Sequence, residues 1–394
     1  MIKLAYLFER FPSFTQTFCY REVMELRRQG CPPSVFSIRS SEEGPAGDWD
    51  AELVRQVNYL PEEKPLVREV QNAIRRAELP NAAAEAIENW GRQTDFLRLY
   101  QAAYIGVRLP KGIQAHAHFA GIAARTAYWI KQFFGIPFSF TAHANDIFVP
   151  RSFAIGIDRL IDSASSVVTE SDYAANYLRT RFPQDAEKIQ CVYNGLDLSN
   201  FPRADFAASV PLVISVGRLI EKKGFSDLIA ACRILEESGH NFRCEIIGEG
   251  PLENDLCAQI EGSNLREKVT LAGAQSQAEI KRRLATASVF ALACTTDSNG
   301  GTDNLPTVIM EAMATGLPVV STELAGIPEM VQPGITGELV PPDDPHELAR
   351  AIKQVITDPA RAREFGNNGL AVAHEKFSIE TSVRSLVSLF GRGG

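Results

Sequence analysis

The feature that most constrains this fold is a repeated alternation of short apolar runs with helical patterns. In the first half of the chain, such runs lie at residues 2–8, 34–38, 113–116, 138–141, 167–169 and 189–192. The second half repeats the scheme at residues 211–216, 242–247, 268–272, 289–292, 319–321 and 337–340. Short apolar strands separated by helices are typical of parallel sheets covered on both faces. Two such series predict an α/β protein with two doubly wound, Rossmann-like domains.

The length of the chain agrees with two domains. Its 394 residues are about two to three times the length of a usual single domain. The turn-rich segment over residues 194–209 is the predicted boundary, because Gly, Pro, Asn and Asp gather there just before a new strand. We expect an N-terminal domain over 1–200, a C-terminal domain over 201–375, and a last helix over 376–394 that packs back on the N-terminal domain.

Charge and cysteine usage exclude several classes of protein. The net charge of −8, from 40 basic and 48 acidic residues, disfavours a nucleic-acid binder. Seven cysteines without a C-x-x-C pair argue for reduced thiols and against a disulfide scaffold or a structural zinc site. The N-terminus lacks a signal-peptide core, and no apolar run is long enough to span a bilayer. We therefore expect a cytoplasmic protein.

The segment SVGRLIEKKGF, which begins at Ser215, places cations at a predicted ligand edge. A strand ends near Gly217, and Arg218 and Lys223 follow in a loop before a helix. Doubly wound folds bind ligands at such strand ends, and free N–H groups at a helix N-terminus favour anions. The pair therefore suits a diphosphate, although ordinary solvated surface charges remain an alternative.

The segment DNLPTVIMEAMATGLPVV, over residues 303–320, places two acids around a helix start. Asp303 precedes the helix and Glu311 lies on its second turn. Carboxylates accept hydrogen bonds from the paired hydroxyls of sugars and riboses. A cap-region acid and a buried helix residue are the alternative interpretation. Two more glycine loops, IIGEGP over 246–251 and AGIPEMV over 325–331, also follow strands, and four such loops favour a ligand site.

The order and spacing of these motifs closely resemble the retaining glycosyltransferases of family four. The resemblance implies the GT-B fold, in which two Rossmann-like domains face each other across a cleft. It implies that Arg218 and Lys223 hold the donor diphosphate, that Glu311 holds the ribose and that Asp303 lines the donor sugar. It also implies donor contacts from Gly217, Gly248, Asn304, Leu305, Pro306 and Thr307. One position departs from the family pattern, because Asp303–Asn304 stands where Glu–Gly is usual.

The N-terminal segment ERFPSFTQTFCYREVMEL resembles the opening of transferases that build exopolysaccharides of the colanic acid type. The resemblance makes Ser13, Thr15 and Gln16 candidates for contacts with the acceptor. A plain strand–loop–helix connection is an equally good interpretation of the same residues.

Three histidines follow or end strands in IQAHAHFAG and FSFTAHANDIF, namely His116, His118 and His143. A metal site is disfavoured, because the sequence has no H-x-x-x-H helix and no further carboxylate at ligand spacing. The resemblance implies that His143 faces the donor sugar, that Asp146 orients the same loop and that His118 lines the cleft. We expect no bound metal.

The resemblance implies a retaining transfer of a sugar from a UDP- or GDP-linked donor to a saccharide or lipid-linked acceptor. The expected context is exopolysaccharide or cell-surface glycan biosynthesis, without a cofactor. Leaving-group stabilisation by cations and helix N-termini would supply most of the catalysis. A nucleotide-sugar epimerase, hydrolase or phosphorylase on the same fold remains an alternative, as does a nucleotide-sugar-binding module without catalysis.

Residues 96–145 contain no Asp or Glu but several aromatic side chains. The charged residues of this span are Arg98, Arg108, Lys111, Arg125 and Lys131. Aromatic rings beside cations suit a membrane interface, which predicts peripheral contact with an anionic inner membrane face. The alternative is that the aromatic side chains belong to the core.

Overall fold

The computed structural model describes residues 3–13, 16–41, 49–90, 95–149, 152–206 and 209–391, and the chain forms two compact units. Unit 1 comprises Met1–Glu170, Ala174–Gly195 and Ile379–Gly394. Unit 2 comprises Ser171–Tyr173 and Leu196–Ser378. The chain thus leaves unit 1 at Gly195, slightly before the predicted boundary at residue 200, and returns to it at Ile379 for the last helix.

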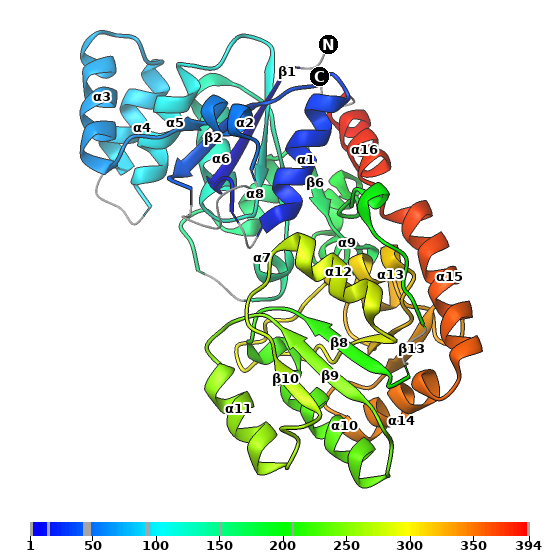
Figure 1. The fold of residues 1–394 in the computed structure, drawn as a ribbon. Helices are drawn as coiled ribbons and strands as arrows, with labels where there is room; N and C mark the ends of the chain where they lie inside the picture. Colours follow the sequence, from blue (N-terminus) through cyan, green and yellow to red (C-terminus); the bar gives the residue numbers. More distant parts are fainter. Residues whose placement is uncertain are drawn as a thin grey trace. The chain divides into compact units, whose positions relative to one another are not determined.

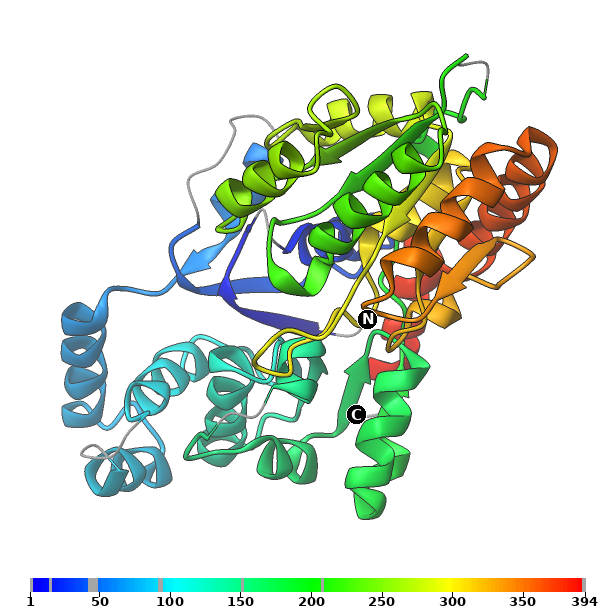
Figure 2. The same cartoon turned by 90° about the horizontal axis from the view of Figure 1, so that it is seen from below.

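Unit 1 is built on a parallel sheet with the strand order β3-β2-β1-β4-β5-β6-β7 (Figure 1). Its strands are β1 (Lys3–Arg10), β2 (Ser34–Arg39), β3 (Asn58–Tyr59), β4 (Ile113–His118), β5 (Phe138–Ala142), β6 (Ser166–Thr169) and β7 (Ile189–Cys191). Its helices are α1 (Thr17–Arg28), α2 (Ala51–Gln56), α3 (Glu63–Arg75), α4 (Asn81–Trp90), α5 (Leu97–Gly106), α6 (Ile122–Phe134), α7 (Ala144–Phe148), α8 (Ile157–Ser163), α9 (Asp172–Arg181) and α16 (Ile379–Gly391). Figure 2 shows α3, α4 and α5 lying side by side.

Alternate residues of the central strands of unit 1 point into two separate cores. On β1, Ala5 and Leu7 belong to a core that includes residues of α5 and α6. Tyr6 and Phe8 belong to the opposite core, which includes residues of α1 and α16. This arrangement follows from the two-residue period of a strand, which sends successive side chains to opposite faces. Helix α16 therefore completes the core of unit 1 beside α1.

Unit 2 has a second parallel sheet, with the order β10-β9-β8-β11-β12-β13. Its strands are β8 (Leu212–Val216), β9 (Arg243–Ile247), β10 (Val269–Leu271), β11 (Val289–Leu292), β12 (Val319–Thr322) and β13 (Gly337–Val340). Its α-helices are α10 (Phe225–Glu237), α11 (Glu253–Gly262), α12 (Gln277–Thr286), α13 (Thr307–Thr315), α14 (Pro345–Ile356) and α15 (Pro359–Lys376). Figure 1 shows α10, α11 and α14 along one face of this sheet and α12 and α13 along the other.

The predicted α/β fold with two doubly wound sheets is confirmed. Every strand expected from the sequence is present, with ends that differ by one or two residues. The sequence analysis missed β3, because a strand of two exposed residues carries no apolar run.

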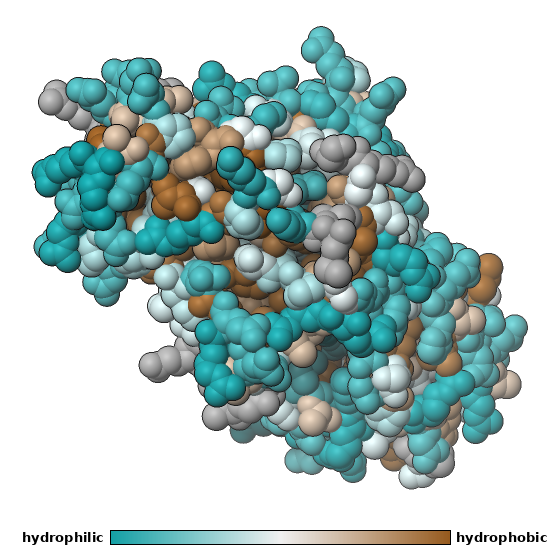
Figure 3. Space-filling view, turned by 90° about the horizontal axis from the view of Figure 1, so that it is seen from above, coloured by the Kyte–Doolittle hydropathy of each residue, from teal (hydrophilic) through white to brown (hydrophobic). Residues whose placement is uncertain are grey.

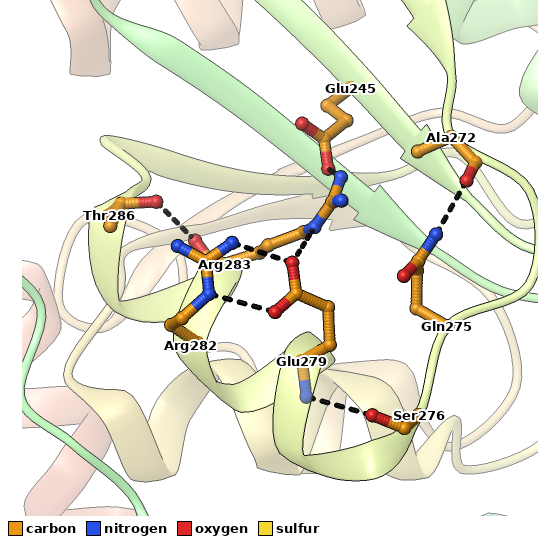
Figure 4. A network of polar contacts seen from close by, with 8 residues as sticks. All are labelled: Glu245, Ala272, Gln275, Ser276, Glu279, Arg282, Arg283 and Thr286. Carbon is orange, nitrogen blue, oxygen red and sulfur yellow. Dashed lines mark hydrogen bonds and ion pairs between the residues drawn. The ribbon is translucent and has the colours of Figure 1, made fainter.

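A polar network attaches α12 to the sheet of unit 2 (Figure 4). The Ser276 hydroxyl caps the helix by accepting the backbone N–H of Glu279 at 3.3 Å. Glu279 accepts hydrogen bonds from Arg282 and Arg283, and Arg283 also donates to Glu245 on β9. These two arginines lower the pKa of Glu279 to about 2. Arg283 thus joins α12 to strand β9.

The acid-free span of unit 1 contributes mainly to the core. Tyr100, Trp129 and Phe133 are buried, and so are the guanidinium-bearing residues Arg98 and Arg125. Both arginines pair with Asp95, which lies just before the span, and the Arg125–Asp95 distance is 2.5 Å. The aromatic side chains on which the predicted membrane contact depended are therefore largely internal. They do not support that contact, which stays a prediction.

Within the described residues, no helix is long and apolar enough to cross a membrane. On the face drawn in Figure 3, hydrophilic side chains predominate, with apolar side chains gathered in smaller areas between them. This distribution accords with the ordinary balance of 45% hydrophobic and 22% charged residues.

Two glycines allow backbone segments of unit 2 to touch at the carboxyl edge of the sheet. A Cβ at Gly224 would lie 1.6 Å from the carbonyl oxygen of Ala293, and a Cβ at Gly248 would lie 1.9 Å from that of Gly217. Both glycines also have a positive φ, of 64° and 149° respectively. A side chain at either position would therefore force the loops after β8, β9 and β11 apart.

We expect Gly224→Ala to lower the free energy of unfolding by about 3 kcal/mol or more, because strain from the positive φ and a backbone clash add together. The matched control is Gly239→Ala, where φ is 73° and nothing lies within 4 Å of the new Cβ. That control isolates the conformational cost, about 1 kcal/mol. Urea denaturation measures both variants, and equal losses would contradict the importance of the close approach.

Candidate functional site

Each sheet reverses its strand order at one point, and candidate residues gather there. In unit 2 the order turns between β8 and β11, and in unit 1 between β1 and β4. Chain connections leave such a pair of strands toward opposite faces, which opens a crevice at the carboxyl edge. The sequence candidates fall into two groups, one in each unit.

The loop after β8 carries the two cations that the sequence analysis selected. Arg218 is exposed and follows Gly217 directly. Lys223 ends a short 3₁₀ helix, Glu221–Lys223, and Gly224 is the N-cap residue directly before α10. The backbone N–H of Gly217 donates to Ile247 of the neighbouring strand β9, so the loop leaves the sheet at a fixed position.

Lys222, Lys223 and Asp303 form a compact ion-pair cluster across the switch point of unit 2. The Lys222 Nζ atom lies 3.2 Å from Asp303 Oδ1, and Lys223 Nζ contacts Asp303 Oδ2. Lys223 comes from the loop after β8, whereas Asp303 comes from the loop after β11. The structure thus brings together the candidates Lys223 and Asp303, which the sequence analysis had assigned to different parts of the donor, and Lys222 joins them.

The cluster holds its members in their charged forms. Burial alone would raise the pKa of Asp303, but the two lysines reverse this effect and lower it. Burial would likewise lower the pKa of Lys223, but Asp303 raises it. The cluster therefore carries one negative and two positive charges at neutral pH, which leaves a net positive charge for an anionic ligand.

The remaining donor candidates lie at the start of α13. Leu305 is buried, Pro306 precedes the helix and Thr307 is its first residue. Glu311 is buried on the second turn. The segment from Asp303 to Thr307 lies at the start of a helix, as the sequence predicted, and the structure adds that this helix follows β11 at the switch point.

Asn304, which stands where the resembled family usually has Gly, is almost completely buried. Its side-chain oxygen accepts the hydroxyl of Ser171 at 2.7 Å, and its backbone oxygen accepts the N–H of Gly326 at 3.0 Å. The amide nitrogen has no hydrogen-bond partner within the described residues. Asn304 therefore anchors the loop before α13 and keeps one donor unused.

In unit 1, His143 follows β5 and is held by acids on two sides. Its Nδ1 atom lies 3.0 Å from Glu170 Oε2, and its backbone N–H donates to Asp146 Oδ2 at 3.0 Å. The amide of Asn194 also donates to Glu170 Oε2, at 2.9 Å. Asp146 thus caps the start of α7 through the backbone of His143, whereas Glu170 contacts the ring and also accepts a hydrogen bond from Asn194.

His118 is buried and contacts the ring of His143. Its Nδ1 atom lies 3.4 Å from His143 Nε2, and its Nε2 atom lies 3.1 Å from Glu22 Oε1. The same Glu22 oxygen accepts the hydroxyl of Tyr6 at 2.6 Å. Glu22, His118, His143 and Glu170 therefore form a continuous hydrogen-bonded row, which we call the histidine row.

The row adjoins a group of possible metal ligands, because Glu22, His116 and His118 bring ligand atoms within 4.8 Å of one another. Both ring nitrogens of His116 are already engaged, with Ser139 at 2.8 Å and Thr141 at 3.0 Å. Burial, with neighbouring His118, lowers the pKa of His116 to about 3. The donors are thus saturated by hydrogen bonds, and the arrangement fits a polar network better than a metal centre.

The predicted acceptor residues lie between β1 and α1. Ser13 is buried, and its carbonyl accepts the backbone N–H of Gln16 at 3.0 Å, just before α1 begins. Thr15 lies outside the described residues.

Sequence reasoning missed Glu22, Glu170 and Lys222. Glu22 sits on the buried side of α1, so an acid among apolar positions was the available signal. Glu170 follows directly after β6, at the edge where ligands bind in such sheets. Lys222 directly precedes Lys223 in the sequence. The short 3₁₀ helix, which the sequence does not reveal, directs its side chain toward Asp303.

Two family models match this chain in succession. The model for Glycosyltransferase Family 4 matches residues 15–200, and the model for Glycosyl transferases group 1 matches residues 200–372. Together they extend over most of both units.

Curated relatives from bacterial polysaccharide pathways are similar over part of their length. WcaL of Escherichia coli K12, assigned to colanic acid biosynthesis as a glycosyltransferase, is 41% identical over 213 residues, which is 52% of this chain and 51% of the relative. The amylovoran biosynthesis glycosyltransferase AmsK of Erwinia amylovora is 37% identical over 209 residues, again 52% and 51%. The chain spans about half the length of these curated relatives.

Solved structures match along the whole chain. A glycosyltransferase of Rickettsia africae superposes with a TM-score of 0.75 at 16% identity and covers 100% of this chain and 98% of its own. Anabaena Alr3699/HepE, solved in complex with UDP, gives 0.72 at 19% identity and covers 99% and 100%. At these identities the likeness shows the GT-B fold alone.

We expect Asp303→Asn to destabilise unit 2, because two neighbouring lysines lose their shared counter-ion. Since the pKa of folded Asp303 is lowered, the wild-type advantage is complete above the ordinary carboxyl pKa and disappears as pH falls through the lowered value. A loss of about 3–5 kcal/mol near pH 7 is expected when one partner of a largely buried ion pair is removed.

Thermal melting between pH 7 and acid pH measures this difference. The exposed Glu364→Gln variant in α15 is the matched control and should melt like the wild type at every pH. A deficit of Asp303→Asn that stayed constant into acid would contradict the ion-pair explanation.

Proposed function

Because this chain belongs to the glycosyltransferases of the family-four type, we propose that it transfers a sugar from a nucleoside diphosphate donor to a saccharide or lipid-linked acceptor. The observation that carries the proposal is the presence of three cations at the switch point of unit 2. These are Lys222 and Lys223 of the ion-pair cluster and the exposed Arg218. A nucleoside diphosphate leaving group needs such positive charge as the bond to the sugar breaks.

The residues of unit 2 divide the donor between them in this proposal. Arg218 and Lys223 bind the diphosphate, since a guanidinium fork and a mobile ammonium suit phosphate oxygens. Asp303 accepts hydrogen bonds from sugar hydroxyls and Glu311 from the ribose diol. The N-terminus of α13 adds backbone N–H groups that favour an anion.

Donor binding must rearrange the ion pairs of the cluster. Lys223 contacts Asp303, so a diphosphate competes with Asp303 for that ammonium. Lys222 can keep the opposite oxygen of Asp303, at 3.2 Å, and hold the carboxylate in place. The shorter side chain of Asp relative to the usual Glu then remains positioned for a sugar hydroxyl.

We propose retention of the anomeric configuration, with the departing phosphate oxygen taking the proton of the acceptor hydroxyl. The sugar–phosphate bond breaks with its electron pair on the diphosphate, and the acceptor oxygen forms the new bond on the same face. The cations provide the main stabilisation, and no metal or cofactor is required for it.

Names of relatives support a UDP- or GDP-sugar donor and a place in exopolysaccharide biosynthesis. The Anabaena neighbour was solved with UDP, and a Mycolicibacterium smegmatis relative is named a GDP-mannose-dependent mannosyltransferase. WcaL and AmsK are both named for exopolysaccharide pathways.

We expect Arg218→Ala to lower the rate of sugar transfer about a hundredfold or more, because one preorganised cation is removed from the leaving group. The melting temperature should stay close to that of the wild type, since Arg218 is exposed. Arg266→Ala removes an exposed arginine elsewhere in unit 2 and should leave transfer unchanged. Near-normal transfer by Arg218→Ala would contradict the proposed diphosphate site.

The proposed reaction is tested by incubating the protein with UDP- and GDP-sugars, with and without saccharide acceptors, in excess EDTA. A donor that binds should raise the melting temperature by mass action, and transfer should require an acceptor and persist in EDTA. Sugar release without acceptor would indicate a hydrolase, and a changed donor sugar would indicate an epimerase. Donor binding without any turnover would indicate a binding module.

A further inference from the structure

Two arginines of the acid-free span are buried in unit 1 on either side of one carboxylate. Arg98 and Arg125 are 7% and 4% exposed. Arg98 Nε lies 3.7 Å from Asp95 Oδ1, and Arg125 Nη1 donates to Asp95 Oδ2 at 2.5 Å. Within the described residues the two cations thus share a single acid in direct contact, and the cluster has one positive charge in excess. A buried charge in excess is costly, so it needs a physical reason.

Arg98 is the less satisfied of the two arginines. Its Nε and Nη1 atoms are buried and have no hydrogen-bond partner among the described residues. An arginine stays charged in proteins, so donors that lose water without replacement raise the cost of burial. Burial lowers the pKa of Arg98, Asp95 opposes this effect, and Arg125 adds to it. The guanidinium therefore has unused donors that the oxygen atoms of an anion can engage.

The other charges close to Arg98 offset each other. Besides the effect of burial, Glu9 raises and Arg39 lowers the pKa of Arg98. These two residues lie at the ends of β1 and β2 and pair with each other at 3.3 Å. They place Arg98 near the carboxyl edge of the sheet, where doubly wound folds bind ligands. The positive charge in excess therefore remains with the two arginines at that edge.

Both arginines occupy the first turn of a helix, a position that ordinarily favours acids. Arg98 is the second residue of α5 and Arg125 the fourth of α6, and neither helix, each fully described, has an acid in its first turn. Arg125 Nε donates to the carbonyl of Gly121, the N-cap residue of α6, at 3.0 Å. A helix N-terminus carries partial positive charge, so it disfavours a cation and stabilises an anion. Cations and helix dipoles thus reinforce each other at one place.

The structure also leaves room for a ligand beside this cluster. A Cβ added to Gly121 would meet no described atom within 4 Å. The Phe153 ring, whose centroid lies 3.8 Å from the guanidinium carbon of Arg125, is 38% exposed. The same ring lines a cavity of about 220 Å³ together with Ala120 and Tyr177. This volume equals that of about seven water molecules in the liquid, and rotation of the exposed ring would open the cavity toward Arg125.

We propose that Arg98 and Arg125 form an oxyanion-binding site of unit 1, which takes a phosphate or carboxylate group from the side of this cavity. A guanidinium fork presents parallel N–H donors that match the oxygen atoms of either group. The oxyanion displaces Asp95 from Arg98, where the contact is long at 3.7 Å, while Arg125 keeps Asp95. That the oxyanion belongs to a sugar acceptor rests on the proposed function, whereas the site itself does not.

Nitrogen-15 NMR of the arginine side chains in the full chain tests the site directly. The Nε–H signal of Arg98 is assigned through bonds from its backbone. Methyl phosphate and sodium glucuronate are titrated separately, against a sodium chloride series of equal ionic strength. We expect a saturable shift of this signal with at least one oxyanion and not with chloride, and it should persist in Arg218→Ala, which alters unit 2. An unchanged Arg98 signal with both oxyanions would overturn the proposal.

The two oxyanions distinguish the possible sources of the group. Methyl phosphate represents a phosphate ester, and glucuronate represents a sugar that carries a carboxylate. A response to either one supports the site and identifies the group that it takes. Glucose is the neutral control, and a shift with glucose as large as that with an oxyanion would overturn recognition by charge.

Variants separate an anion site from a purely structural ion pair. Arg98→Gln, followed at the Nε–H of Arg125, should weaken oxyanion binding about tenfold or more, because charged hydrogen bonds are lost. Asp95→Asn removes the competing carboxylate and should strengthen binding about tenfold. Arg108→Gln removes an exposed arginine of the same span and should leave the affinity unchanged. Unchanged affinity in both Arg98→Gln and Asp95→Asn would overturn the proposal, and the wild-type titration decides it if either variant does not fold.

Kinetics of sugar transfer connect the site to the acceptor. With an acceptor that carries the oxyanion identified by NMR, Arg98→Gln should raise the KM for the acceptor about tenfold or more and leave the KM for the donor unchanged. If no sugar is transferred under any condition, the proposed function fails while the NMR titration still decides the site. An unchanged acceptor KM, with oxyanion binding shown by NMR, would overturn the assignment of the oxyanion to the acceptor.

Discussion

The reversal of strand order in each parallel sheet is the constraint on which both candidate sites depend. Parallel strands end at the same edge, and the loops of neighbouring strands normally continue to the same face. Only where the order reverses do two loops separate and leave room for a ligand. In unit 2 this point lies between β8 and β11, and in unit 1 it lies between β1 and β4. In unit 2 the candidate residues lie on the loops after β8 and β11, whereas in unit 1 Glu22 lies on α1 after β1, His118 ends β4 and His143 follows the neighbouring strand β5.

The two units use that constraint with opposite electrostatic designs. In unit 2, two lysines surround one carboxylate, so the cluster retains positive charge and an anionic ligand can compete for the lysines. In unit 1, two carboxylates lie at the two ends of a pair of hydrogen-bonded histidines. The first arrangement leaves net positive charge at the switch point, and the second buries a polar network between α1 and the sheet. Both hold ionised groups away from water by pairing them, which offsets the cost of burial.

Backbone contacts keep these side chains in place. Gly224 and Gly248 let the loops after β8, β9 and β11 touch, and the loop that bears Lys223 is thereby seated next to the one that bears Asp303. In unit 1, α16 comes from the far end of the chain and packs beside α1. Its Phe390 lies 5.0 Å from His116, and its Ser382 donates to the carbonyl of Tyr193, next to Asn194. Helix α16 thus packs against His116 and the segment before Asn194, next to the histidine row.

The sequence by itself determined the strands, the two sheets and the segments that bear the candidate residues, because these depend on local periodicity and on motifs of contiguous residues. The alternation in IQAHAH, for example, already requires His116 and His118 to share one face of a strand. It could not show that Glu22, on a helix 96 residues earlier, approaches His118. Nor could it show that Glu170, which directly follows the next strand β6, approaches His143. It also could not show that Lys222 joins Lys223 on Asp303, or that Arg98 and Arg125 are buried against Asp95. Those contacts follow from strand order and helix packing, which bring together residues that have no local signal for one another, and only the tertiary structure decided them.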